Sequence, residues 1–212
     1  MRVALLSPYS WTYPGGVTRH IEALARELSA AGHEPSILAP FDPDDAMSRH
    51  LHRGARPQAL AKPDNLIALG RTIGFPANGA VSNLTGTPHS VFALRRQLRG
   101  GRYDVLHIHE PVVPLLSWDA LCSAPEDLPL VGTFHTYSEN QLTNGFAAVP
   151  LGARRRMNRL HARIAVSEAA AWTARRFYGG RYRIVPNGVL LPTVADGSLL
   201  EQASDEPLPL GG

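Results

Sequence analysis

The first forty residues alternate short apolar runs with a helical repeat. Residues 3–6 form an apolar run closed by Pro8, which is the pattern of a buried strand. After a loop rich in Tyr, Pro and Gly, apolar residues recur at helical spacing over 17–28, and Gly32 supplies the stop. Residues 36–39 form a second apolar run. These patterns predict a β-loop-α-β unit with parallel strands.

The pattern is irregular from residue 41 to residue 86 and periodic again after that. The irregular segment holds many Pro, Gly, Asp and Arg residues and only short apolar pieces, such as 66–69, which predicts small strands or an excursion with long loops. Strands then alternate with helices, which is typical of a doubly wound parallel sheet. The predicted helices are 88–99, 114–122, 151–161 and 168–177, and the predicted strands are 105–108, 130–134, 164–166 and 183–185.

The predicted fold class is therefore α/β, a Rossmann-like doubly wound parallel sheet over residues 1–190. A chain of 212 residues with 44% hydrophobic residues can bury one sizeable core. The apolar periodicity disappears from residue 191, and 196–212 holds Asp, Glu, Ser, Pro and Gly without a core face. Residues 191–212 are predicted to be a linker or tail.

Composition and charge narrow the partners and the location. The net charge is +3, and nearly all basic side chains are arginines, with Lys62 the single lysine. Arginine binds phosphates and carboxylates through a planar fork, although a solvated arginine-rich surface explains the same composition. The single cysteine, Cys122, excludes an internal disulfide and fits a reducing compartment. No apolar run approaches the roughly 20 residues of a membrane span, so we expect a cytoplasmic protein, at most peripheral at the inner face of the plasma membrane.

Polar side chains follow five of the predicted strands. In open α/β sheets, ligands bind just beyond the carboxyl ends of the strands. Five polar strand ends therefore predict a single cleft at one edge of the sheet. The groups are Tyr9 and Ser10 after the first strand, His109 and Glu110, His135 and Thr136, Ser167 and Glu168, and Asn187 before Gly188.

Gly15 and Gly16 stand directly before the first predicted helix. A glycine pair there lets the backbone approach a ligand while the helix N–H groups face an anion. The alternative is a tight turn that needs glycine for a positive φ. The pattern is not G-x-G-x-x-G, and Pro40 and Phe41 follow the second strand in place of an acidic residue. The sequence thus argues against a dinucleotide-binding oxidoreductase.

The histidines at the strand ends invite two interpretations. His107 and His109 alternate along a strand and share a face, so with Glu110 they imitate a metal cluster. No third ligand follows at convincing spacing, and we predict no metal site. His135 ends an apolar strand and precedes hydroxyl side chains suited to sugar or phosphate recognition. It is predicted to stabilise developing charge or hold a hydroxyl, unless it is a buried histidine paired with backbone.

Arginines cluster on two predicted helices. Arg95, Arg96 and Arg99 lie opposite an apolar face, and a second run extends over 154–163. Basic amphipathic helices bind anionic membranes, although such runs also form the solvated face of core helices. No nucleic-acid-binding motif accompanies the arginines, so a nucleic-acid partner is not expected.

Taken in order, these motifs resemble those of glycosyltransferase family 4, and within it the phosphatidylinositol mannosyltransferases. The resemblance runs from Met1 to about Val189 and rests on six spaced matches. They are Pro8-Tyr9-Ser10 with Pro14-Gly15-Gly16-Val17; Ala31-Gly32-His33-Glu34; Asp104-Val105-Leu106-His107-Ile108-His109-Glu110-Pro111; Thr133-Phe134-His135-Thr136; Ile164-Ala165-Val166-Ser167; and Pro186-Asn187-Gly188-Val189.

The resemblance implies the acceptor-binding N-terminal half of a two-domain GT-B enzyme that transfers a sugar with retention and needs no cofactor. The co-substrate would be a nucleotide sugar, GDP-mannose or a UDP-sugar. By resemblance, His135 contacts the transferred sugar as the catalytic residue. Gly15 and Gly16 approach the donor diphosphate, the acceptor contacts are Tyr9, Thr18, Asn78 and Thr136, and the helix of Arg95, Arg96 and Arg99 docks on anionic lipid.

Three departures from the family pattern limit these expectations. The donor half is missing, so we expect no useful transfer by this chain alone. Ala80 and Asn83 stand where the inositol-lipid enzymes carry a serine and a phosphate-binding arginine, and Thr18 replaces a glutamine. The acceptor is therefore left open between a lipid and a small alcohol. A non-catalytic sugar- or lipid-binding module and a fragment of a sugar-nucleotide epimerase remain alternatives.

Overall fold

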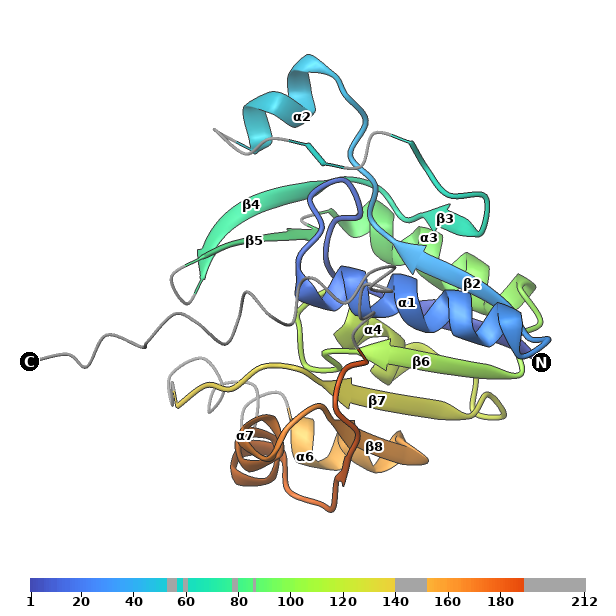
Figure 1. Cartoon of the computed structure of the whole chain (residues 1–212), viewed down its shortest axis with the longest axis vertical. Coiled ribbons are helices and arrows are strands. Elements are labelled where there is room, and N and C mark those ends of the chain that lie inside the picture. Colours follow the sequence, from blue (N-terminus) through green and yellow to red (C-terminus); the bar gives the residue numbers. More distant parts are fainter. Residues whose placement is uncertain (53–56, 59–60, 78–79, 86, 140–151, 189–212) are drawn as a thin grey trace, which may run out of the picture.

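A seven-stranded parallel sheet forms the centre of the molecule, in a computed structural model that describes residues 1–52, 57–58, 61–77, 80–85, 87–139 and 152–188. The strand order is β3-β2-β1-β6-β7-β8-β9 (Figure 1). Every pairing in this sheet is parallel, which confirms the α/β prediction. The strands are β1 (Arg2–Leu6), β2 (Glu34–Ala39), β3 (Leu66–Ala68), β6 (Val105–His109), β7 (Leu130–Phe134), β8 (Ala162–Ala165) and β9 (Arg183–Ile184).

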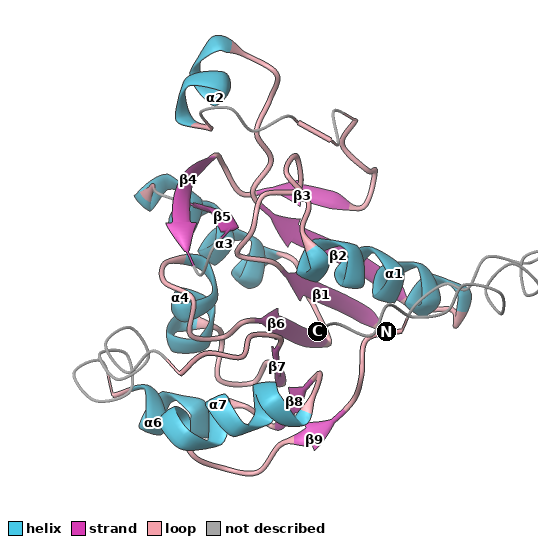
Figure 2. Ribbon diagram, turned by 60° about the vertical axis from the view of Figure 1, so that its left-hand side comes forward, coloured by secondary structure: helices cyan, strands magenta, loops and turns pink. Residues whose placement is uncertain are grey.

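Helices cover both faces of the sheet (Figure 2). Alternate residues of β1 point to opposite faces, so Val3 and Leu5 pack with α1 (Gly16–Ala30), whereas Ala4 and Leu6 join the core on the other face. That second core contains side chains of α3 (Pro88–Gly100), α4 (Leu116–Ser123), α6 (Ala153–Arg156) and α7 (Glu168–Tyr178). Among the described residues, no helix is long and apolar enough to span a bilayer.

The segment 41–86 contains a small helix and a hairpin. Helix α2 (Ala46–Leu51) starts at Asp45, whose carboxylate accepts the N–H of Ser48 at 2.8 Å. Strands β4 (Thr72–Ala77) and β5 (Ala80–Thr85) form a separate antiparallel sheet. Figure 1 shows this hairpin projecting beyond the edge of the main sheet where β6 and β7 end. The sequence predicted small strands or an excursion with long loops here. β3, β4 and β5 are such strands, but the helix and the antiparallel pairing of β4 with β5 were not predicted.

The basic helix predicted over 151–161 is wrong in length. Within the described part, α6 covers only four residues and a 3₁₀ turn, Met157–Arg159, follows it. Leu160 is extended, with ψ 119°, and ends the helical stretch. Arg159 donates to the carbonyls of Leu121 and Ala124 at 2.8 and 2.7 Å, so it is bound to the end of α4 rather than displayed on a helix face.

Candidate functional site

Four histidines meet where β6 and β7 end beside the first turns of α1. His107 and His109 share a face of β6, as strand alternation predicted, and their ring centroids lie 4.4 Å apart. His135, directly after β7, stacks on His109 at 5.2 Å. His20 of α1 meets His109 and His135 edge-on at 5.6 and 5.1 Å. The sequence analysis had not singled out His20, although it lies one helical turn after Gly16.

Burial keeps these imidazoles neutral. It lowers the pKa of His135 to about 3 and that of His107 to about 4, and in each case charge on neighbouring histidines lowers it further. The pKa of His109, which is 0% exposed, lies well below its usual value for the same reasons. His109 Nδ1 lies 2.9 Å from His135 Nε2, a hydrogen bond between two rings. His135 therefore carries no charge near neutral pH.

Glu110 fixes the segment that carries His135. Its Oε1 accepts the His135 backbone N–H at 2.8 Å and the Thr136 hydroxyl at 2.6 Å, and burial raises the pKa of this carboxyl. The backbone of Glu110 has φ +51°, a left-handed conformation that costs a non-glycine residue about 1 kcal/mol. The two hydrogen bonds offset that cost and join the ends of β6 and β7. Thr136 is exposed, so its surroundings remain open to a ligand.

Tyr9 and the two glycines bring the end of β1 to the same place. Burial raises the pKa of the Tyr9 phenol, and the charge of Glu110 raises it further, so the two side chains are electrostatic neighbours. A Cβ on Gly15 or Gly16 would meet no atom within 4 Å. Gly15 has φ −109°, so its backbone conformation does not demand glycine. The open space before α1 favours close ligand approach over the tight-turn alternative.

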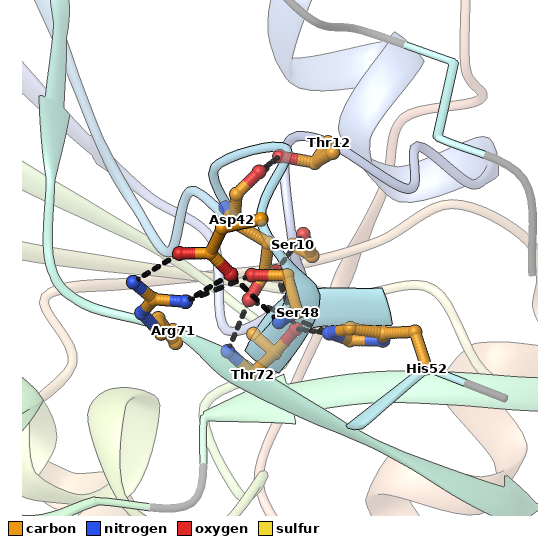
Figure 3. A network of polar contacts seen from close by, with 8 residues as sticks. Ser10, Thr12, Asp42, Ser48, His52, Arg71 and Thr72 are labelled. Carbon is orange, nitrogen blue, oxygen red and sulfur yellow. Dashed lines mark hydrogen bonds and ion pairs between the residues drawn. The ribbon is translucent and has the colours of Figure 1, made fainter. Parts of the chain in front are cut away.

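A buried polar network holds the loop between β1 and α1 in place (Figure 3). At its centre is Asp42, which is 1% exposed. Its carboxylate accepts the Ser10 hydroxyl at 2.6 Å, and the Thr72 N–H and hydroxyl at 2.8 and 2.7 Å. The Thr12 hydroxyl donates to the Asp42 carbonyl at 2.8 Å and accepts its N–H at 2.9 Å. The network thus links the loop bearing Tyr9 to the base of the β4–β5 hairpin, and no sequence motif indicated it.

The remaining predicted site residues are not gathered around His135 in the same way. Thr18 is buried, and its hydroxyl has no partner within the described segments. Ser167 caps α7, accepting the Ala170 N–H at 3.1 Å, which is a structural task. Asn187 is exposed after β9. Asn78 lies outside the described residues, so its predicted acceptor contact stays a prediction.

The three arginines of α3 differ in their surroundings. Arg95 binds Asp119 of α4 through two guanidinium nitrogens, with contacts of 2.5 to 3.1 Å. Arg96 and Arg99 are exposed, and Phe92 beside them is 67% exposed. Arg95 therefore joins two helices, while the other two arginines and Phe92 form an exposed basic and aromatic surface.

The sequence of the chain is similar to those of known glycosyltransferases. The model of Glycosyltransferase Family 4 matches residues 14–191. A phosphatidyl-myo-inositol mannosyltransferase of Mycolicibacterium smegmatis is 36% identical over 202 residues, covering 95% of this chain and 47% of that protein. The corresponding protein of Propionibacterium freudenreichii is 32% identical, covering 90% of this chain and 47% of its own length. The chain thus spans about half the length of the curated relatives it matches.

Solved structures confirm the fold class. A glycosyltransferase from Rickettsia africae superposes with a TM-score of 0.51 at 14% identity, covering 95% of this chain and 48% of that one. An α-glucosyltransferase in complex with UDP-glucose and DNA gives 0.53 at 13% identity, covering 89% and 43%. These neighbours are GT-B glycosyltransferases, and at sequence identities this low they support the fold alone. Because the family model covers most of its length and curated relatives exceed 30% identity, the chain belongs to Glycosyltransferase Family 4.

Proposed function

We propose that this chain is the acceptor-binding half of a retaining glycosyltransferase that moves a hexose from a nucleotide sugar to a lipid or small-alcohol hydroxyl. The observation that carries the proposal is the position of His135, which Glu110 and His109 fix beside His20 of α1, the helix that Gly15 and Gly16 open. The names of the curated relatives favour mannose as the sugar.

The start of α1 suits the diphosphate of a nucleotide sugar. The first N–H groups of a helix have no partner within the helix and carry partial positive charge. Here they lie behind two glycines that leave the approach open. We infer that the diphosphate binds at Gly15 and Gly16 and that the sugar extends toward His135. A neutral His135 then holds a sugar hydroxyl, and its contribution is orientation rather than charge.

The acceptor is proposed to bind between the β4–β5 hairpin and residues 135–139. Both project beyond the same edge of the main sheet (Figure 1). Tyr9 and Thr136 line this side from β1 and β7, and each is tied to Glu110 through charge or a hydrogen bond. The mannosyltransferase names point to a phosphatidyl-myo-inositol acceptor, whereas Ala80 and Asn83 on β5 depart from the residues expected in those enzymes. A different lipid or a soluble alcohol is therefore included in the proposal.

Transfer is the test of this function. We expect no product from this chain alone, because the second half of the relatives would supply most groups that stabilise the leaving diphosphate. A chimera in which this chain replaces the matching half of the Mycolicibacterium smegmatis enzyme should transfer sugar. Donors would be GDP-mannose and UDP-sugars, and acceptors phosphatidylinositol, other lipids and small alcohols. NMR of the anomeric proton of the product should show the donor configuration.

Each outcome bears on one part of the proposal. A chimera inactive with every pair, beside an active native relative, would contradict the acceptor role. Transfer by the chain alone would contradict its dependence on a second half. An inverted anomeric centre would contradict retention, and acceptor binding without any transfer would favour a non-catalytic module.

We also propose that α3 docks this half on the inner face of the plasma membrane. The double substitution Arg96→Gln and Arg99→Gln should weaken binding to anionic vesicles by about 25-fold, since each basic residue near such a surface contributes roughly 1 kcal/mol. Co-sedimentation with phosphatidylglycerol vesicles at rising salt measures this. Arg26→Gln with Arg175→Gln, exposed arginines on α1 and α7, is the charge-matched control. Equal loss in the control, or equal binding to neutral vesicles, would contradict docking by α3.

A further inference from the structure

Three histidines from separate elements bring ring nitrogens close together. They are His20 on α1, His109 at the end of β6 and His135 after β7. One nitrogen from each lies within 4.8 Å of the other two. We propose that they form a binding site for a divalent transition-metal ion, and Zn²⁺ is the ion we expect it to bind. The proposal does not depend on the transferase function, because it concerns only these side chains.

One pair of these nitrogens lies close to the spacing of tetrahedral coordination. Zinc lies about 2.05 Å from imidazole nitrogen, so two ligand nitrogens in a tetrahedral site are about 3.3 Å apart. His109 Nδ1 and His135 Nε2 are 2.9 Å apart, so a small opening of this pair admits the ion in place of the shared proton. His20 approaches both rings edge-on, with interplanar angles of 65°. Three protein nitrogens leave the fourth position open.

The donor set selects for transition metals over Mg²⁺ and Ca²⁺. Neutral imidazole suits Zn, Cu and Ni, whereas the harder ions require carboxylate and carbonyl oxygens. Glu110, the nearest acidic group in sequence, is bound to His135 N–H and to Thr136. The three proposed ligands also differ from the group of His107, His109 and Glu110 noted in the sequence. His107 is not included because its Nε2 is bound to Thr133 Oγ1 at 2.7 Å.

Two ring nitrogens show that the cluster is not a complete hydrogen-bond network. His109 Nε2 and His135 Nδ1 are buried and have no partner within the described part of the chain. A buried polar atom without a partner is uncommon in proteins. Metal ligands usually donate the second nitrogen to a carboxylate or carbonyl, and loss of such a partner costs about 10- to 100-fold in affinity. We therefore expect affinity in the micromolar range rather than that of a structural zinc site.

One of the three histidines borders space that solvent reaches. His20 is half-buried and lines a hollow between α1 and residues 185–188, together with Leu24, Val185 and Pro186. Solvent therefore reaches His20 along α1. An ion bound here would occupy the nitrogen lone pairs beside the proposed sugar position.

Zinc titration of the EDTA-treated and dialysed chain tests the site directly. Isothermal titration calorimetry should show one Zn²⁺ per chain, and Co²⁺ should give the intense visible absorption of a tetrahedral site. His20→Ala and His135→Ala should each weaken binding at least tenfold. His50→Ala and His89→Ala, at exposed histidines of α2 and α3, should leave it unchanged. His20→Asn serves where His20→Ala alters the far-ultraviolet circular dichroism.

Several results would overturn the site: no zinc bound, binding that both cluster variants leave unchanged, or binding that the exposed-histidine controls remove. Mg²⁺ binding as tightly as Zn²⁺ would also contradict it. Neither the zinc titration nor the Co²⁺ spectrum uses a sugar or an acceptor. A negative result for metal binding is therefore distinct from a negative result for the proposed transfer. An inactive chimera with intact zinc binding would contradict the proposed transfer and support the metal site.

Discussion

His135→Ala in the active chimera is expected to lower kcat by about 10²-fold while the KM for the acceptor changes little, by analogy with loss of one preorganised hydrogen-bond group at a reacting centre. The reason is geometric. His109 and Glu110 hold His135 in one place, so it loses no freedom when the sugar reacts. A fixed interaction of this kind acts mainly on the transition state and is seen in kcat rather than in acceptor affinity. Steady-state kinetics in EDTA measure this without metal effects.

His89→Ala is the matched control, because His89 is an exposed histidine on α3. It should leave both constants unchanged. A kcat for His135→Ala within twofold of the unsubstituted chimera would show that the residue does not contact the reacting sugar. An increase confined to the acceptor KM would show that His135 contributes to acceptor binding instead.

Asp42→Ala is expected to destabilise the chain by about 3 to 5 kcal/mol, because it leaves the Ser10 hydroxyl and the Thr72 backbone N–H without the acceptor that they have in the structure. For a domain of this size the melting temperature should fall by roughly 10 °C. Urea denaturation followed by circular dichroism measures the change in unfolding free energy. Asp42→Asn keeps one acceptor oxygen, so its unfolding free energy should lie between those of Asp42→Ala and the unsubstituted chain.

Asp44→Ala is the control, two residues away. Asp44 forms an ion pair with Arg49 at 2.6 Å, but both side chains are more than half exposed. Exposed pairs of this kind contribute about 0 to 1 kcal/mol. If Asp42→Ala and Asp44→Ala differed by less than 1 kcal/mol, the buried network would not be what secures the loop.

The sequence predicted those parts of the fold in which apolar pattern and packing coincide. Strands β1, β2, β6, β7 and β8 lie close to their predicted positions, because a strand buried on both faces is a continuous apolar run. Helix α2 was missed because its apolar pieces are short, and the β4–β5 pairing was missed because Pro76, which lies within β4, argues against a strand in the sequence. The helix over 151–161 was predicted too long, because its arginine run hid the extended backbone at Leu160.

The site was predictable where it depends on strand ends. His109, Glu110 and His135 were expected at one edge of the sheet, and the structure joins them by hydrogen bonds. His20 and Asp42 were not, because each reaches its partners through tertiary packing. The partner of a helix residue such as His20 can be predicted only when the rotation of the helix against the sheet is known. A loop residue such as Asp42 lies in a segment without periodicity, so no pattern predicts its partner.

The separation of the β4–β5 hairpin from the seven-stranded sheet has a consequence for divergence within the family. No strand of the main sheet is hydrogen-bonded to the hairpin in the described structure, and Asp42 anchors it at Thr72. Substitutions beyond that anchor leave the ladders of the main sheet intact. With the hairpin in its proposed acceptor role, descendants of a common ancestor can exchange this one segment and acquire a new acceptor, while inheriting the sheet and its histidines unchanged.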